Sequence, residues 1–418
     1  MHRYRRVSLA LSLAAAALVA PASAQTNGPL QSPLTLNEAM RLAGERREEI
    51  TAAHAAIRAG EQRPAIVSAL ADPMISPSID HLPFMLGGAD VSFAIEQQFP
   101  LSRVRQHRRT SAMAGLDRLR AEADRTVLDV GLQAATGFLM VQERRRTQAL
   151  VIEQVTFARD VVQAANARYA SGTAPQSDVL RAEVEVARIE ALSRSLVSEV
   201  RAAEAMLNTS LGLDADSPVP PLAPFGSIEA PPSWSAIKSA LNARPELAAG
   251  RADVARADAE VQVMQDMFRP MVTVRTGPAY TMAEGKGWMA MVGVSLPIWR
   301  GKLRAGVAEA KSMRAMSEAD LRAMTRMIEG DAAVALHQLH SVRGRQAALT
   351  TEVLPRAQMT LQPAIAGYTS GQLPLVSVIE AVQSLWRVQA DVIAADVELG
   401  LAWARLGRAV GSYKGIVQ

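Results

Sequence analysis

Two histidines three residues apart, His337 and His340, are the first residues whose spacing could support chemistry. Side chains at positions i and i+3 of a helix share a face, so such a pair can hold a metal ion. No carboxylate and no third histidine accompanies them in the sequence, and a closed metal site needs further ligands. We therefore interpret both histidines as solvated polar residues and expect no metal site.

The chain has 18 methionines, and several recur at helical spacings. Thioether sulfur suits Cu(I), so a metal-contacting role is one interpretation. Adaptable filling of a core is the commoner role of methionine and is the interpretation we favour. The residues concerned are Met264, Met267, Met313, Met316, Met324 and Met327.

Signatures of catalysis are missing from the 418 residues. The sequence has no cysteine, which excludes disulfides, thiolate metal sites, a cysteine nucleophile and a lipid-modified N-terminal cysteine. It also has no glycine-rich phosphate loop, nucleophile elbow or metalloprotease motif. We therefore expect no enzyme, no catalytic residue and no cofactor.

The extreme N-terminus has the pattern of a secretory signal peptide over residues 1–24. Arg3, Arg5 and Arg6 precede an apolar run over residues 7–20, and small residues at 22–24 offer a cleavage site. Without these three arginines the formal net charge falls from +4 to +1, which argues against a nucleic-acid partner. No later stretch has about 20 consecutive apolar residues, so we expect no membrane-spanning helix.

The rest of the chain contains one long unit twice. The turn Tyr169-Ala170-Ser171-Gly172 recurs 199 residues later as Tyr368-Thr369-Ser370-Gly371, and Arg47-Glu48-Glu49-Ile50 is similar to Arg244-Pro245-Glu246-Leu247. Collinear matches at a near-constant spacing indicate a duplication. We expect a first repeat at 25–213, a proline-rich linker at 214–233, a second repeat at 234–411 and a tail at 412–418.

Each repeat has the same predicted order: a helix, two alternating segments, a much longer helix, a Ser-Gly turn and a shorter helix. Only 4% of the residues are aromatic although 49% are hydrophobic, which favours extended helices packed on one another. Pro355 and Pro363 predict a kink or break near the end of the second long helix. The predicted helices span 36–71, 104–169, 177–211, 234–268, 303–368 and 376–410, and the fold class is mainly α with a small β part.

The alternating segments have the period-two pattern of outer-membrane strands. Trp288, Val292 and Val294 share one face of the last segment, and residues 91–99 alternate in the same way except at Gln97. A single hairpin of this kind also fits a half-buried soluble sheet. Two hairpins at matching places in a duplicated secreted chain favour membrane strands.

Four strands cannot close a barrel, and an open sheet edge is not tolerated in hydrocarbon. Three chains supply twelve strands, whereas two supply eight, which leave no conduit. We therefore predict a homotrimer with a 12-stranded transmembrane β-barrel, four strands from each chain. The longer helices, about 65 residues and about 100 Å each, would continue it as an α-helical barrel.

Several motifs resemble the TolC-like outer-membrane efflux proteins. They are the run from Leu34 to Ala39, the Arg244 motif and the two Tyr-x-Ser-Gly turns, and the resemblance spans residues 34–411. It implies a trimeric channel in the outer membrane of a Gram-negative cell, with a periplasmic extension and contact with outer-membrane lipid. It also implies a periplasmic adaptor protein and an inner-membrane efflux pump as partners. Residues 97–101 and 293–298 most resemble the heavy-metal cation efflux branch.

The same resemblance implies that the two helical turns form the periplasmic tip. Gly172 and Gly371 are the glycines of these turns, and Tyr169 and Tyr368 precede them. These four residues would lie where the adaptor binds.

The resemblance further implies an aperture at the tip, lined by Asp178, Ser377 and Glu380. Acidic residues at such places favour cations in the family. Ser377 replaces one expected carboxylate, and Leu373 stands where a basic tie residue can occur. Asp178 also fits a simpler interpretation, an acidic residue near a helix N-terminus that the helix dipole favours.

These expectations lead to a passive outer-membrane conduit for tripartite efflux that exports small solutes, with metal cations as one candidate cargo. Type I protein secretion uses the same kind of channel and stays open as an alternative, because the pump selects the cargo. A periplasmic adaptor or coiled-coil protein is a second alternative. Such a protein would have one long hairpin flanked by small β-domains and would lack duplicated lipid-facing strands.

Overall fold

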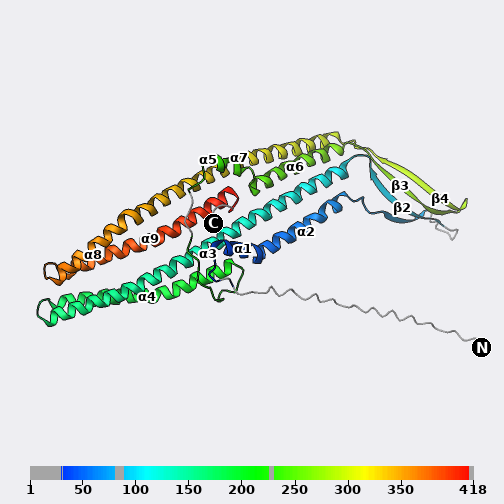
Figure 1. Cartoon of the computed structure of the whole chain (residues 1–418). Coiled ribbons are helices and arrows are strands. Elements are labelled where there is room, and N and C mark those ends of the chain that lie inside the picture. The colour runs from blue at the N-terminus through cyan, green and yellow to red at the C-terminus, as the bar shows by residue number, and fades with distance from the viewer. Residues whose placement is uncertain (1–29, 31, 81–88, 226–229, 414–418) are drawn as a thin grey trace, which may run out of the picture.

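The computed structural model describes residues 30, 32–80, 89–225 and 230–413 of the chain. The predicted signal peptide, residues 1–24, lies outside the described residues. The fold is mainly helical with one four-stranded sheet, and the molecule is elongated, with the strands at one end and two helical turns at the other (Figure 1). None of the described helices combines the length and apolarity needed to cross a membrane.

The same order of elements occurs in both halves of the chain. The first half contains α1 (Leu36–Arg46), α2 (Glu48–Ser68), β1 (Met74–Asp80), β2 (Asp90–Pro100), α3 (Val104–Ala170) and α4 (Gln176–Ser210). The second half contains α5 (Trp234–Leu241), α6 (Pro245–Asp266), β3 (Met271–Thr281), β4 (Gly285–Ser295), α7 (Arg300–Ala348), the π-helical turn η1 (Leu349–Val353), α8 (Leu354–Thr369) and α9 (Leu375–Val410).

Two of the predicted helices are each divided in two, so the expectation of single helices over 36–71 and 234–268 was wrong. Arg47 separates α1 from α2, and Arg244 directly precedes α6; both are extended, with ψ of 133° and 137°. Pro245 disfavours helical geometry at the residue before it, which explains the second break. The first break has no proline, and contacts of the Arg47 side chain with the end of α4 account for it.

The predicted kink near Pro355 takes the form of one π-helical turn, η1, directly before α8. Proline lacks an N–H group, and its ring crowds the carbonyl four residues earlier. A wider π turn accommodates both defects without ending the rod. Pro363 lies inside α8, which continues to Thr369.

The helix α3, with 67 residues, is the spine of the molecule and extends for about 100 Å. Toward the turns it packs against α4, and toward the strands against α2 and α6 (Figure 1). Helix α9 lies between α3 and the α7–α8 rod. Near mid-length, Phe138, Leu139 and Leu207 are fully buried in the largest core cluster.

The proline-rich segment after α4 is held against this core. Leu222 forms a parallel β-bridge with Leu34. The guanidinium of Arg145 donates to the carbonyl of Pro220 at 2.7 Å and to the carboxylate of Glu204 at 2.6 Å. Arg145 therefore ties the end of α4, the proline-rich segment and α3 together.

Candidate conduit surfaces

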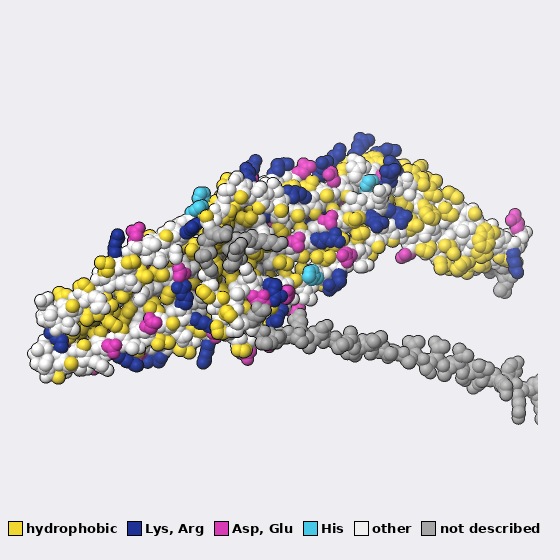
Figure 2. Space-filling model, viewed as in Figure 1, with side chains coloured by type: hydrophobic (Ala, Val, Ile, Leu, Met, Phe, Trp, Pro, Cys, Tyr) yellow, Lys and Arg dark blue, Asp and Glu magenta, His cyan; other side chains and the backbone are white. Residues whose placement is uncertain are grey.

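The four strands form an antiparallel sheet in the order β1-β2-β3-β4, and one face of it is apolar and exposed. The register places Ile75 opposite Ile95, and Val274 opposite Val292. Trp288 and Val292 are 71% and 69% exposed, which is high for large apolar side chains. Figure 2 shows apolar side chains gathered at the strand end of the molecule. Its members are Ile75, Ile79, Val91, Phe93, Ile95, Phe99, Val274, Tyr280, Trp288, Val292 and Val294.

The opposite face of the sheet carries most of its polar and small residues, together with the methionines Met74, Met271 and Met291. Glu96 lies opposite Arg275, and Gln98 lies opposite Thr273, with Gly293 next to Thr273 on β4. A sheet with one apolar and one polar face separates two environments, because successive side chains of a strand point to opposite faces. Since the apolar face is not covered by any described helix, the sheet has no soluble core of its own.

Gln97 is the one polar residue that interrupts the apolar face of β2. Its side-chain amide donates to the carbonyl of Ala71 at 2.8 Å, just after α2. The polar group is therefore satisfied at the end of the sheet where the strands meet the helices.

The two strand hairpins approach most closely at Gly277. A Cβ atom at this position would lie 1.9 Å from the carbonyl oxygen of Phe93 and 2.8 Å from the Cα of Ala94. No side chain fits there unless β2 and β3 separate, so glycine is required by the pairing of the two repeats.

At the other end of the molecule the two helical turns have matching geometry. Gly172 and Gly371 have φ angles of +72° and +78°, the left-handed conformation that favours glycine at the end of a helix. Their N–H groups donate to the carbonyls of Tyr169 and Tyr368 at 2.9 and 3.0 Å. The duplicated Tyr-x-Ser-Gly motif therefore encodes the same turn twice.

The two tyrosines of these turns differ in their surroundings. Tyr169 is 47% exposed, whereas Tyr368 is 4% exposed and belongs to a cluster that joins the two helical hairpins. Burial raises the pKa of Tyr368, and the negative charge of Asp178 raises it further, while Arg168 opposes both. The phenol is therefore held in its protonated form.

Arg168, which no motif in the sequence singled out, connects the two hairpins. Its guanidinium lies 4.5 Å from the centre of the Tyr368 ring and donates to the Tyr368 carbonyl. The other Nη atom donates to the carbonyl of Thr173 at 3.2 Å, within its own turn. Position 373 has a leucine instead of a basic residue, and Arg168 of the opposite hairpin makes the contact to this turn instead.

The sequence did carry a signal for this tie. Arg168 in the first repeat aligns with Gly367 in the second. A Cβ at Gly367 would lie 2.6 Å from a methyl group of Leu373, so the leucine occupies the space of the missing side chain. The departure of one repeat from the other marks the residue that acts between them.

The three expected aperture residues lie just beyond these turns. Asp178 and Ser377 lie near the starts of α4 and α9, and Glu380 is exposed one turn further along α9. Within one chain they do not converge into a site.

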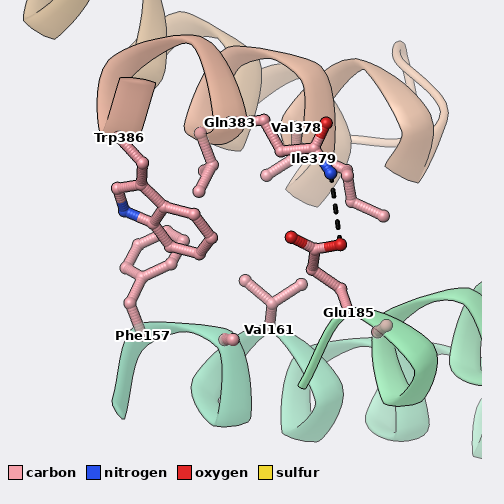
Figure 3. Close-up of a pocket in the computed structure, with 10 residues that line it drawn as sticks. Phe157, Val161, Glu185, Val378, Ile379, Gln383 and Trp386 are labelled. Atoms are coloured by element: carbon pink, nitrogen blue, oxygen red, sulfur yellow. Dashed lines mark hydrogen bonds between the residues drawn. The ribbon is translucent and has the colours of Figure 1, made fainter. Parts of the chain in front are cut away.

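Further from the turns, a small pocket of about 20 Å³, room for about one water molecule, lies between the two hairpins (Figure 3). Phe157 from α3 meets Trp386 from α9 edge to face, with ring centroids 6.2 Å apart. The Gln383 amide donates to the Glu185 carboxylate at 3.1 Å. The pKa of Glu185 is lowered by its hydrogen bond with Arg188, against a rise from burial. Apart from this small space, the two hairpins are packed against one another here.

Comparisons with known proteins agree with this arrangement. Residues 236–412 match the family described as outer membrane efflux protein. The cobalt-zinc-cadmium resistance protein CzcC of Cupriavidus metallidurans is 24% identical over 68% of this chain and 68% of its own length. The pyoverdine export outer membrane protein OpmQ of Pseudomonas aeruginosa is 26% identical over 74% of this chain and 66% of its own length. The solved structure of CusC has a TM-score of 0.79 at 15% identity and covers 90% of this chain and 92% of that one.

The second half of the chain thus matches the outer membrane efflux protein family, and relatives of 24% and 26% identity are proteins of metal resistance and pyoverdine export. The resemblance inferred from the motifs is therefore confirmed. The matched regions span about two thirds of the length of the two relatives, 68% and 66%. The structural likeness extends over nearly the whole chain and concerns the fold.

The Arg244 motif has a structural role in the described chain. Arg244 is 5% exposed, donates to the Ala409 carbonyl at 2.7 Å and pairs with Glu246 at 2.7 Å. Arg408 also reaches Glu246, at 2.8 Å. Burial raises the pKa of Glu246, but the hydrogen bonds from Arg244, the backbone and Arg408 outweigh it, so the pKa lies below its ordinary value.

The equivalent Arg47 of the first repeat is a more exposed version of the same clamp. It donates to the carbonyls of Thr209 and Ser210 at the end of α4, and it pairs with Glu49. In both repeats an arginine satisfies carbonyls in the last turn of a helix, where the helix dipole favours a cation. This contact fixes the extended conformation that separates α1 from α2.

Several methionines that the sequence analysis singled out are exposed in the single chain. Met313, Met316 and Met327 are 52%, 54% and 55% exposed on α7, so these three fill no core within the single chain. Met324 does pack against the core cluster of the second half. His337 is exposed, as we interpreted it, and no three His, Cys, Asp or Glu residues of the described ranges form a group that could hold a metal.

Proposed function

We propose that the chain is the outer-membrane channel component of a tripartite efflux system and acts as a passive trimeric conduit. The observation that carries this proposal is the sheet with one exposed apolar face and one polar face, continuous with helices about 100 Å long. The apolar face suits lipid, the polar face suits a water-filled lumen, and the helices suit a passage across the periplasm.

The trimer follows from the free edges of the sheet. Strands β1 and β4 each have one unpaired edge in the described chain. Edges exposed to hydrocarbon leave N–H and C=O groups unsatisfied, so neighbouring copies must pair with them. Three copies give twelve strands, which supports a 12-stranded barrel and an α-helical barrel built from all three chains.

The helical turns are proposed as the periplasmic end. Gly172, Gly371, Tyr169 and Tyr368 would contact the adaptor protein, which in turn links the channel to an inner-membrane pump. Asp178, Ser377 and Glu380 would line the aperture when three chains surround one axis. Carboxylates of Glu380 brought together in this way would attract cations.

The proposal also concerns the class of solute that the channel exports. The names of CzcC and OpmQ point to metal resistance in one relative and to export of pyoverdine in the other. Metal cations are therefore one candidate cargo among small solutes. A periplasmic adaptor fits less well, because the chain has two paired strand hairpins and two helical hairpins.

Substitutions on the two sheet faces test the membrane assignment. Val292→Lys places a charge on the apolar face, where it should cost about 2–4 kcal/mol near the bilayer centre. Thr273→Lys places the same charge on the polar face and is the matched control. We expect the first variant to lose assembly into the outer-membrane fraction and the second to assemble. Equal assembly of both would refute a lipid-facing sheet.

A deletion strain tests the cargo. Tolerance of copper, zinc, cobalt and cadmium and of hydrophobic drugs should be compared with and without a plasmid-borne copy of the chain. Lower tolerance of metals, restored by the wild-type copy, would support metal export. Unchanged tolerance of every metal would remove metals as cargo while leaving the channel itself in place.

A further inference from the structure

A hollow of about 500 Å³ lies where the strands meet the helices, on the polar side of the sheet. Gln98, Met271 and Ser295, which lie on the polar face of β2, β3 and β4, form its strand wall. None of the exposed apolar residues of the opposite face lines it. The hollow therefore opens to the side of the sheet that we propose as the lumen, and the role assigned to it rests on that proposed function.

Arginine dominates the helical wall of the hollow. Arg105 and Arg108 come from the first turns of α3, and Arg269 follows the end of α6. Asp266 is the one carboxylate among the lining residues. Three arginines and one aspartate leave a net charge of +2 in each chain, and three chains around one axis would give +6.

The arginines are not neutralised by their neighbours. Arg269 lies 3.8 Å from Asp266, a long ion pair. Arg105 donates to the carbonyl of Ser68 at 2.6 Å, a contact that leaves its charge in place. Arg108 is exposed and has no hydrogen bond or ion pair with any described residue. Of the three arginines, only Arg269 has a carboxylate partner among the described residues, and the charges of Arg105 and Arg108 are not balanced by one.

The first turns of α3 are an unfavourable place for this charge. The positive end of the helix dipole lies there, and the first turn has no acidic residue to compensate. Local stability would favour Asp or Glu at these positions. Arginines clustered at a helix N-terminus oppose the preference of the helix dipole, and such local conflicts are expected at functional sites.

We propose that this hollow, the arginine collar, binds multivalent anions and selects for them as solutes pass from the helical part of the conduit to the strands. Planar guanidinium groups match the oxygens of phosphate and carboxylate. Anionic organic solutes, and metal ions carried in complexes of net negative charge, are favoured at the collar. Free metal cations are disfavoured there.

Ion selectivity of the reconstituted channel tests the collar, with Arg108→Gln as the variant. Arg109→Gln is the control, because Arg109 is the next residue of α3, is exposed and does not line the hollow. For solutes passing about 10 Å from each guanidinium at 0.1 M salt, loss of three charges lowers the chloride-to-potassium permeability ratio about fivefold. The effect should vanish near 1 M salt, and Arg109→Gln should match the wild type.

Binding of inorganic pyrophosphate to the detergent-solubilised protein, measured by calorimetry, is a second readout that needs no open pore. We expect wild type and Arg109→Gln to bind alike, and Arg108→Gln to bind about tenfold more weakly. Equal permeability ratios and equal pyrophosphate affinities in the two variants would overturn the collar while leaving the conduit intact. A wild-type protein that forms no pore in bilayers would overturn the conduit, and the collar with it.

Discussion

Replacing Arg168 by alanine should release the two helical hairpins of each chain from one another at the turns. The substitution removes the hydrogen bond to the Tyr368 carbonyl, the stacking over the Tyr368 ring at 4.5 Å and the hydrogen bond to Thr173. The tie is therefore one side chain with three contacts, two of them to the opposite hairpin.

The magnitude follows from the two contacts between hairpins. A hydrogen bond from a charged group contributes about 1.5–3 kcal/mol, and a cation–π contact about 0.5–2 kcal/mol. Tyr368 is 4% exposed, so neither contact is fully screened by water. Allowing for non-additivity, we expect about 2–4 kcal/mol for each chain. Even 2 kcal/mol shifts the ratio of open to closed tips about 30-fold.

Single-channel recording of the reconstituted protein measures this shift as the fraction of time spent in the high-conductance state. Arg181→Ala is the matched control, because Arg181 is an exposed arginine on α4 with no hydrogen bond or ion pair to any described residue. Arg168→Lys keeps the charge but loses the planar fork, so it should fall between wild type and Arg168→Ala. If Arg168→Ala and Arg181→Ala open equally often, charge alone is responsible and the tie has no role in closing the tip.

Three further substitutions test the framework. Gly277→Ala should cost about 3 kcal/mol or more of stability, because the added methyl group separates β2 from β3. Gly287 has open space around it, so Gly287→Ala is the control. Comparing heated and unheated samples on gels, we expect the control, but not Gly277→Ala, to assemble like the wild type. Arg244→Ala should cost about 2–4 kcal/mol, because it removes the closest partner of the buried Glu246 and leaves Arg408 at 2.8 Å and Arg125 at 4.0 Å. Arg47→Ala should cost only about 1 kcal/mol. Thermal unfolding in detergent would show the difference, and equal shifts would contradict it. The pKa of Glu246 is lowered from 4.5, so the stability that its ionised carboxylate contributes is present above that pH and is lost as the pH falls below it. Glu246→Gln should therefore flatten the acid side of the pH–stability profile, and an unchanged acid side would contradict this.

Most of the helix ends could be predicted from the sequence because glycine and proline mark them. Helices predicted at 104–169, 177–211 and 376–410 are observed at Val104–Ala170, Gln176–Ser210 and Leu375–Val410. Each boundary follows from a residue that cannot continue a helix, such as Gly172, Pro175 or Pro374. The alternation of the strands was equally readable, because a sheet with one apolar face requires it.

The breaks in the shorter helices could not be read in the same way. Residues 36–71 have no glycine or proline at Arg47, and the extended conformation there depends on carbonyls of Thr209 and Ser210, more than 160 residues away. Contacts between distant segments override local propensity, and no local pattern announces them. The exposure of Met313, Met316 and Met327 was missed for a related reason, because apolar spacing alone does not show whether a helix face is covered.

The two repeats differ at Arg168 and Gly367, and this difference determines which pairs of helical hairpins are tied together at the tip. Within one chain, Arg168 of the first repeat holds Tyr368 of the second. The reciprocal tie, from the second repeat to the first repeat of a neighbouring chain, would need an arginine at Gly367, where Leu373 fills the space. Tyr169, the residue such a tie would hold, is 47% exposed in the chain. In the proposed trimer the Arg168 tie therefore joins the two hairpins of one chain, and no equivalent tie joins hairpins of neighbouring chains. Arg168→Ala should accordingly open the tip by separating the hairpins within each chain.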